Sequence, residues 1–230
     1  MKSKANIMHE AALRIIESYH QNGDPFTLFL SSWPFDMARK LLFSLMGRNG
    51  DVQVRIGLER QVRIMLKQDG LETVAVYREG DDQRIAIPQE WPALTMPEKE
   101  WKRQIEQLAG LADLIVVFWG VTSDSLAEEL DICSADANRL KTVAIVPAEP
   151  RDIFLSQMHQ VIPRIVPLNE IPPFIGLHPE FDPLIQRMKV LKALDSNERR
   201  GLIEQSERVN KFPLPPTSER FAAPFWIEMH

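Results

Sequence analysis

The chain has 230 residues, of which 44% are apolar, 27 are lysine or arginine, 32 are aspartate or glutamate and one is cysteine, and its formal net charge is −5. This apolar content is sufficient for a packed core and excludes a wholly disordered chain. The negative charge argues against a nucleic-acid partner, which requires a basic footprint. One cysteine excludes an internal disulfide framework, and no apolar run approaches the roughly 20 residues of a membrane span. We therefore expect a cytoplasmic protein without a membrane span.

Helical spacing of apolar residues begins near the N-terminus, where Met8, Ala12 and Ile15 share one face and the turn residues 22–25 end the segment. Thr95 and Glu98 fit a capping box, which places the start of another helix near residue 96. The same spacing predicts further helices at 36–46, 58–66, 124–139 and 183–194, and a last one from the cap residues 195–198 to about 210.

Apolar runs without alternation predict strands that are buried on both faces. These runs are 26–31, 73–77, 114–118, 142–146 and a weaker fifth at 164–168. The proline-containing stretch 83–97 is expected to be irregular or a small hairpin. Buried strands separated by helices are typical of a parallel sheet covered on both faces.

The predicted fold is therefore α/β, with a doubly wound, mainly parallel sheet of four to five strands and helices on both faces. An N-terminal helix precedes it and a C-terminal helical extension follows it. We divide the chain into an N-terminal helix at 1–23, the α/β domain at 24–180, and C-terminal helices with a proline-rich apolar tail at 181–230.

Several motifs that would identify an enzyme class are absent from the sequence. The chain has no phosphate-binding P-loop, no glycine-rich dinucleotide motif after the first strand and no nucleophile elbow. Its five histidines lack metal-ligand spacing, so we expect no metal site. Cys133 lies on the apolar side of its predicted helix and is expected to be a buried small side chain.

Polar and aromatic residues follow three of the predicted strands. In an open parallel sheet, ligands bind at the carboxyl ends of the strands. The candidate nucleotide-binding residues at these ends are Ser31, Ser32, Trp33, Arg78, Trp119 and Ser123. The alternative interpretations are a solvated loop charge for Arg78 and core packing for Trp119.

Two carboxylates on the helix after the third strand differ in direction. At about 100° per residue, the buried side is defined by Leu126, Leu130, Cys133 and Ala137. Glu128 points away from it and fits a capping box, whereas Glu129 lies on the flank, about 80° from the centre of that side. A carboxylate there can grip ribose hydroxyls or stabilise the oxocarbenium ion of glycosidic cleavage. The alternative is a half-exposed acid favoured by the helix dipole.

Several segments together resemble a TIR-like bacterial domain family, whose fold is flavodoxin-like and related to that of nucleoside deoxyribosyltransferases. The segments are Pro25 to Asp36, Gly57 to Val62, Trp101 to Leu108, Ala112 to Val117, and Glu129-Leu130. Enzymatic members carry Ser-x-Trp-Cys-x-x-Glu-Leu, and its glutamate, which supports cleavage of NAD, matches Glu129. The Trp-Cys pair is absent here, and Ser31 replaces the arginine that the family has after the first strand.

The resemblance implies a nucleotide-binding domain in bacterial signalling or defence, with Glu129 as the catalytic carboxylate and NAD as a substrate rather than a cofactor. One alternative is a non-catalytic protein-interaction or ligand-sensing module. Another is a nucleoside-processing transferase, which needs a base acceptor. The apolar segments 5–20 and 211–230 are candidate surfaces for a homo-oligomer or a protein partner.

Overall fold

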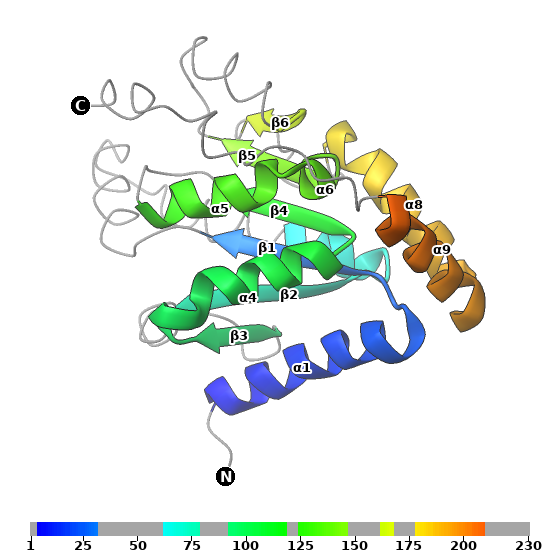
Figure 1. Ribbon diagram of the computed structural model, residues 1–230, viewed down its shortest axis with the longest axis horizontal. Coiled ribbons are helices and arrows are strands. Elements are labelled where there is room, and N and C mark those ends of the chain that lie inside the picture. The colour runs from blue at the N-terminus through cyan, green and yellow to red at the C-terminus, as the bar shows by residue number, and fades with distance from the viewer. Residues whose placement is uncertain are drawn as a thin grey trace.

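A computed structural model describes residues 4–31, 62–78, 92–118, 124–146, 162–167 and 178–209. These residues form an α/β fold around one six-stranded sheet in the order β3-β2-β1-β4-β5-β6, and every pair of neighbouring strands is parallel (Figure 1). The strands are β1 (Phe26–Ser31), β2 (Glu72–Arg78), β3 (Ala93–Met96), β4 (Leu114–Phe118), β5 (Thr142–Val146) and β6 (Arg164–Pro167). The predicted fold class is confirmed.

The helices separate these strands along the chain, as a parallel sheet requires. They are α1 (Lys4–Asn22), α4 (Glu98–Leu111), α5 (Asp124–Ser134), α6 (Asp136–Arg139), α8 (Asp182–Ala193) and α9 (Ser196–Val209), with a short 3-10 helix, η2 (Pro179–Phe181), before α8. Residues 62–68 are also helical. The N-terminal helix and the two C-terminal helices lie close to their predicted positions. The predicted helix 36–46 and the tail 211–230 lie outside the described residues.

The sheet has one strand more than the four to five predicted. The additional strand is β3, in the stretch that we expected to be irregular or a small hairpin, and it pairs with β2 from Ala75↔Ala93 to Arg78↔Met96. Thr95 belongs to this strand and not to a helix cap. Helix α4 starts at Glu98, with Pro97 at its N-cap and no side-chain cap, so the predicted capping box does not form.

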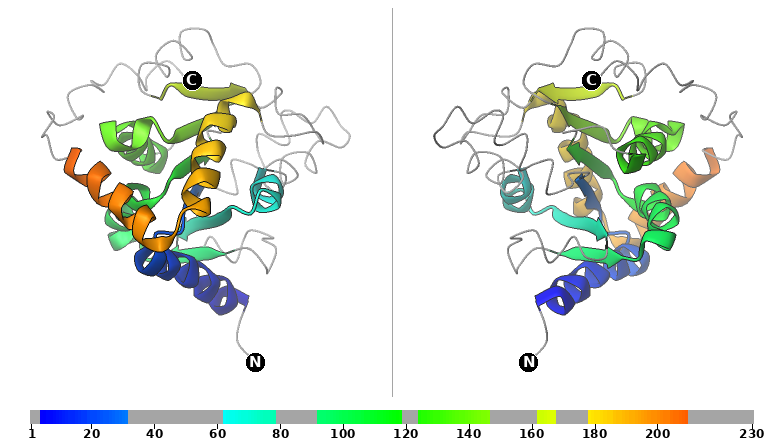
Figure 2. Two further views of the ribbon diagram at one scale, coloured as in Figure 1. Left: turned by 90° about the vertical axis from the view of Figure 1, so that its right-hand side faces the viewer. Right: turned by 90° about the vertical axis from the view of Figure 1, so that its left-hand side faces the viewer.

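Two apolar clusters fill the two faces of the sheet, and β1 supplies both by alternation. Leu28 and Leu30 belong to the cluster beneath α4 and α5, which we call the first face. Phe29 belongs to the cluster beneath residues 62–68 and α8, the second face. Figure 2 shows these helices on opposite sides of the sheet. The sheet is therefore doubly wound, and both faces of its central strand are buried.

Helix α1 lies along the β3 side of the sheet and contacts β3 and β2 (Figures 1 and 2). Its buried residues reach both layers, because Met8 joins the second-face cluster and Ala12 the first-face cluster. A helix in this position covers the polar backbone of an outer strand, which otherwise can pair with another chain. Most of the apolar face predicted at 5–20 therefore packs within the fold.

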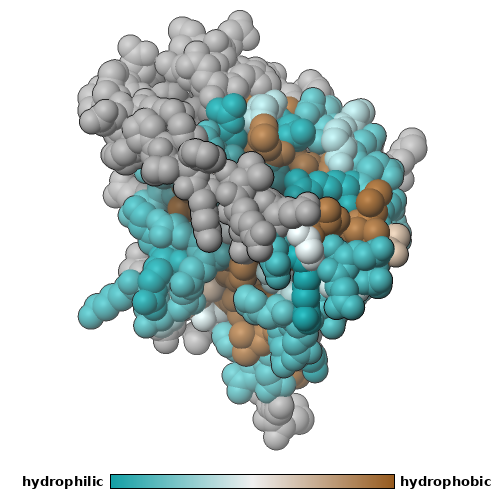
Figure 3. All heavy atoms as spheres, turned by 45° about the vertical axis from the view of Figure 1, so that its right-hand side comes forward, coloured by the Kyte–Doolittle hydropathy of each residue, from teal (hydrophilic) through white to brown (hydrophobic). Residues whose placement is uncertain are grey.

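On the face seen in Figure 3, the described residues are mostly hydrophilic, with separate apolar spots. The large apolar side chains that remain exposed are Ile7, Leu13, Ile64, Leu140, Val190 and Leu202, and they are spread over several elements. Scattered exposed apolar residues are normal on soluble domains. Among the described helices, none has the length and apolar character needed to cross a bilayer.

Candidate functional site

The candidate site lies where the strand order reverses. From β1 the chain adds β2 and β3 on one side and then returns to add β4, β5 and β6 on the other. In open α/β sheets the crevice at such a point, outside the carboxyl ends of the strands, is where ligands bind. Here these ends are Ser31 of β1 and Phe118 of β4, which are paired in register. Helix α5 then begins at Asp124, six residues after β4 ends.

The structure brings two of the predicted nucleotide-binding residues to this end of the sheet. Ser31 is the last residue of β1 and Arg78 the last residue of the adjacent strand β2. The other four predicted nucleotide-binding residues lie outside the described residues; they are Ser32, Trp33, Trp119 and Ser123. Trp101 is 4% exposed and belongs to the first-face cluster, so it is a core residue.

Glu129 is more deeply buried than the helical arithmetic predicted. It is 2% exposed, beside Leu130 and Cys133 on the same helix, whereas Glu128 is half-buried. The arithmetic placed Glu129 about 80° from the centre of the buried side. It also counted Ala137 as buried and left out Ile132. In the structure Ile132 is buried and Ala137 is exposed, which shifts the buried arc toward Glu129.

The shift arises because the predicted helix 124–139 is two helices, α5 and α6, with a bend at Ala135. Side chains hold this bend. The buried Asn138 amide nitrogen donates to the Ile132 carbonyl at 2.8 Å, and the Thr142 hydroxyl donates to the Asn138 carbonyl at 2.9 Å. The end of α5 is thereby tied to the first residue of β5.

Cys133 is a structural residue, as predicted. Its side chain is fully buried, and burial together with the nearby Glu129 carboxyl raises the pKa of the thiol. A thiol that stays protonated is a poor nucleophile. Of the two predicted residues Cys133 and Glu129, the thiol is thus unsuited to nucleophilic chemistry.

Glu129 lies on the helix that follows β4 at the reversal of the strand order. It lies five residues into α5, or roughly 7 Å along the helix from its start at the carboxyl end of the sheet. A carboxylate in a buried site of low dielectric stabilises a developing positive charge more strongly than a carboxylate in water does.

A second buried charge, which the sequence analysis missed, lies on the opposite face of β1. Arg63 is 2% exposed, and its guanidinium carbon is 4.9 Å from the centre of the Phe29 ring. Such a cation–π contact offsets part of the cost of burying the guanidinium. Arginine side chains are rarely buried, so the residue type gave no signal here. The burial of Arg63 could have been predicted only if the limits of the buried helical face had been known.

A third cluster of charges lies at the amino end of the sheet. Asp113, just before β4, faces Arg187 of α8 and Lys141, just before β5. Burial raises the pKa of Asp113 to about 6, although Arg187, Lys141 and the Phe26 amide act to lower it. Burial lowers the pKa of Lys141 to about 8. Lys141 Nζ donates to the carbonyls of Gly110 at 3.0 Å and Ala112 at 2.7 Å, at the end of α4.

This third cluster has a structural explanation. A cation at a helix C-terminus satisfies carbonyls that lack a partner within the helix. The cluster also lies at the end of the sheet opposite to the one where α/β folds bind ligands. Within the described residues there is no group of three or more His, Cys, Asp and Glu side chains that could hold a metal ion.

Comparisons of the chain with protein-family models, with curated proteins and with solved structures gave no match.

Proposed function

We propose that this chain is a TIR-like nucleotide-binding domain that cleaves the glycosidic bond of NAD, with Glu129 as the catalytic carboxylate. The observation that carries the proposal is the burial of Glu129, at 2% exposure, on the helix that follows β4 at the reversal of strand order. The resemblance of Glu129-Leu130 to the enzymatic pattern supports the same residue. The proposal extends to a role in bacterial signalling or defence, in the cytoplasm.

The proposed reaction is a hydrolysis. The bond between the nicotinamide nitrogen and the ribose anomeric carbon breaks, and its electron pair leaves with nicotinamide. The Glu129 carboxylate stabilises the positive charge that develops on the ribose, and water supplies the hydroxyl group while releasing one proton. Ser31, Ser32 and Trp33 would line the ribose or base pocket, Trp119 and Ser123 would close it, and Arg78 would receive phosphate.

The test is nicotinamide release from NAD by the purified chain, compared with Glu129→Gln over a series of protein concentrations. We expect release by the native chain and a loss of at least about 100-fold in the variant, because an amide cannot balance the charge of the sugar. Glu128→Gln is the matched control, since its carboxyl is on the same helix and is only half-buried. Equal loss in both variants, or equal activity in Glu129→Gln, would contradict the proposal.

A second candidate is a non-catalytic ligand-sensing or interaction module. The absence of the Trp-Cys pair and the exposure of Ile7 and Leu13, at 44% and 47%, favour it. This candidate predicts NAD binding or self-association without nicotinamide release. Calorimetry with NAD tests the ligand-sensing form of this candidate. Sedimentation of the chain, with and without residues 211–230, tests the interaction form. A transferase would instead release base only when a second base is supplied.

A further inference from the structure

We propose that α9 is a detachable latch, which docks on the amino end of the sheet through the ion pair of Arg199 with Asp24 and leaves it as a unit while α8 and the sheet stay folded. This conformational device is independent of the proposed activity. It follows from a difference between the two C-terminal helices, which are adjacent in the chain (Figure 1).

Helix α8 is part of the core. Leu184, Ile185 and Met188 are at most 5% exposed and belong to the second-face cluster. The Thr27 hydroxyl of β1 contacts the Met188 sulfur at 3.9 Å. Removing α8 would therefore expose apolar core surface, which makes its separation from the sheet costly.

Helix α9 is attached differently. Among its described side chains, 196–204, the only buried one is that of Arg199, and Ile203 is half-buried. Both pack against Gly23, where a β-carbon would lie 3.2 Å from Arg199 Cβ and 3.3 Å from Ile203 Cδ1. Within residues 196–204 the apolar contribution to docking is thus small, and the polar contact dominates.

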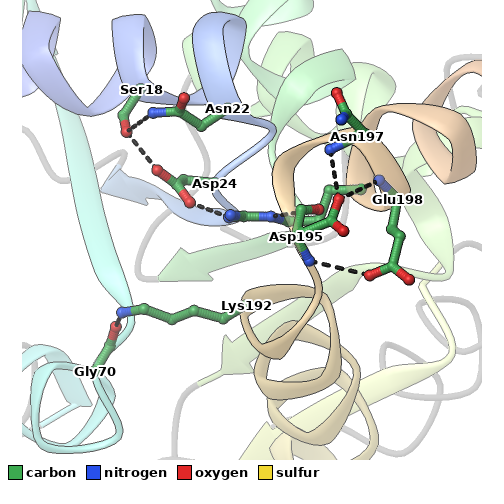
Figure 4. A network of polar contacts seen from close by, with 9 residues as sticks. Ser18, Asn22, Asp24, Gly70, Lys192, Asp195, Asn197 and Glu198 are labelled. Carbon is green, nitrogen blue, oxygen red and sulfur yellow. Dashed lines mark hydrogen bonds and ion pairs between the residues drawn. The ribbon is translucent and has the colours of Figure 1, made fainter.

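That polar contact is a small network at the end of α1 (Figure 4). The Arg199 guanidinium donates to one oxygen of Asp24, and the Ser18 hydroxyl donates to the other at 2.5 Å. Partial burial acts to raise the pKa of Asp24, but the bonds from Ser18 and Arg199 outweigh it and lower the pKa. The Asp24 side chain is 38% exposed, so salt can reach and screen the pair.

The start of helix α9 is capped within its own sequence, so this cap does not depend on contact with the sheet. Asp195 Oδ1 accepts from the amides of Asn197 and Glu198, both at 2.9 Å. In return, the Glu198 carboxylate accepts from the Asp195 amide at 3.1 Å, which completes a capping box. Leu194, in extended conformation, separates the two helices and is the natural hinge.

The test is native-state hydrogen exchange of the full chain, with α9 compared with α8 and the strands. We expect the amides of α9 to exchange through a local opening with a lower free energy than the opening that exposes the amides of α8 and β1. Arg199→Met should speed exchange in α9 by roughly tenfold to a hundredfold, the range for a lost charged hydrogen bond, and leave α8 and β1 unchanged. Arg200→Met is the matched control, because Arg200 is exposed on the same helix.

A second measurement uses the native chain alone. Raising sodium chloride to 1 M should selectively speed exchange in α9, since screening weakens a partly exposed ion pair. Three results would overturn the latch: α9 exchanging together with α8 and the strands, equal effects of the two arginine variants, or an Arg199→Met chain that does not fold. The last would show that Arg199 holds the whole fold and not α9 alone.

Discussion

The two ends of the sheet each hold a carboxyl group that is shielded from water, Asp113 half-buried and Glu129 buried, and their surroundings differ. At the amino end, Asp113 faces Lys141 and Arg187, and burial raises its pKa to about 6. Toward the carboxyl end, Glu129 is 2% exposed on the helix after β4. Shielding from water alone would favour both as functional residues. Of these two carboxyl groups, only Glu129 lies toward the end of the sheet at which open parallel sheets bind ligands. Position in the fold therefore distinguishes the two groups.

The amino end is also where the C-terminal helices fasten the central strands. Turns before three strands carry aspartates that face cations of α8 or α9: Asp24 with Arg199, Asp69 with Lys189 at 2.6 Å, and Asp113 with Arg187. The Lys192 ammonium also donates to the Gly70 carbonyl. Charges at this end therefore hold the C-terminal helices against the sheet, and substitutions at Lys141, Asp113, Gly23 and Gly70 test how much this end contributes to stability.

The largest effect is expected from Lys141→Met. The variant removes the donor to the Gly110 and Ala112 carbonyls and one of the cations that face Asp113. Losing these charged hydrogen bonds, with the two carbonyls left without their donor, should lower the free energy of unfolding by about 3 kcal/mol. Urea denaturation at pH 7 measures it, with the exposed Lys99→Met as control. A change under about 0.5 kcal/mol would show that Lys141 contributes no more than a surface residue.

Asp113→Asn should act in the opposite direction. The folded-state pKa of about 6 is above the ordinary 3.8, so the folded chain holds this proton more tightly and loses stability as pH rises from about 4 through 6. Asparagine cannot ionise, so we expect the variant to be about 2 kcal/mol more stable than the native chain at pH 7.5 and equal to it near pH 3.

Urea denaturation at both pH values measures this difference, and Asp136→Asn, at an exposed pair with Arg139, is the control. A variant less stable than the native chain at pH 7.5 would mean that the Arg187 and Lys141 charges outweigh burial. The double variant with Lys141→Met should then cost less than the two single changes added together, since each removes the other's partner.

The smallest effect compares two glycines at the amino end. Gly23 and Gly70 have φ of 71° and 73°, a region that disfavours any β-carbon, so either change to alanine should cost about 1 kcal/mol. A β-carbon at residue 23 also meets Arg199 and Ile203, whereas at residue 70 it meets only the mobile end of Lys192. We expect Gly23→Ala to cost about 1 kcal/mol more, measured by thermal unfolding. Equal losses of stability in the two variants would mean that α9 moves away from a β-carbon at residue 23 without a measurable cost.

Continuous apolar runs were sufficient to predict five of the six strands, because a strand buried on both faces must be apolar throughout. The sixth, β3, has four residues between Pro92 and Pro97, and its extended form depends on pairing with β2. Helix spacing located α5 but not the bend at Ala135, since no glycine or proline marks it and a side chain of α6 holds it.

The local pattern of residues thus determined the fold class and the choice of Glu129 as a candidate, because periodicity and strand ends are local properties. Tertiary packing decided how deeply Glu129 is buried, since the length of α5 and the burial of Ile132 set its helical face. It also decided which charges meet at the amino end of the sheet. Asp24 and Arg199 are 175 residues apart, and only the folding of α9 onto the turn before β1 makes them partners.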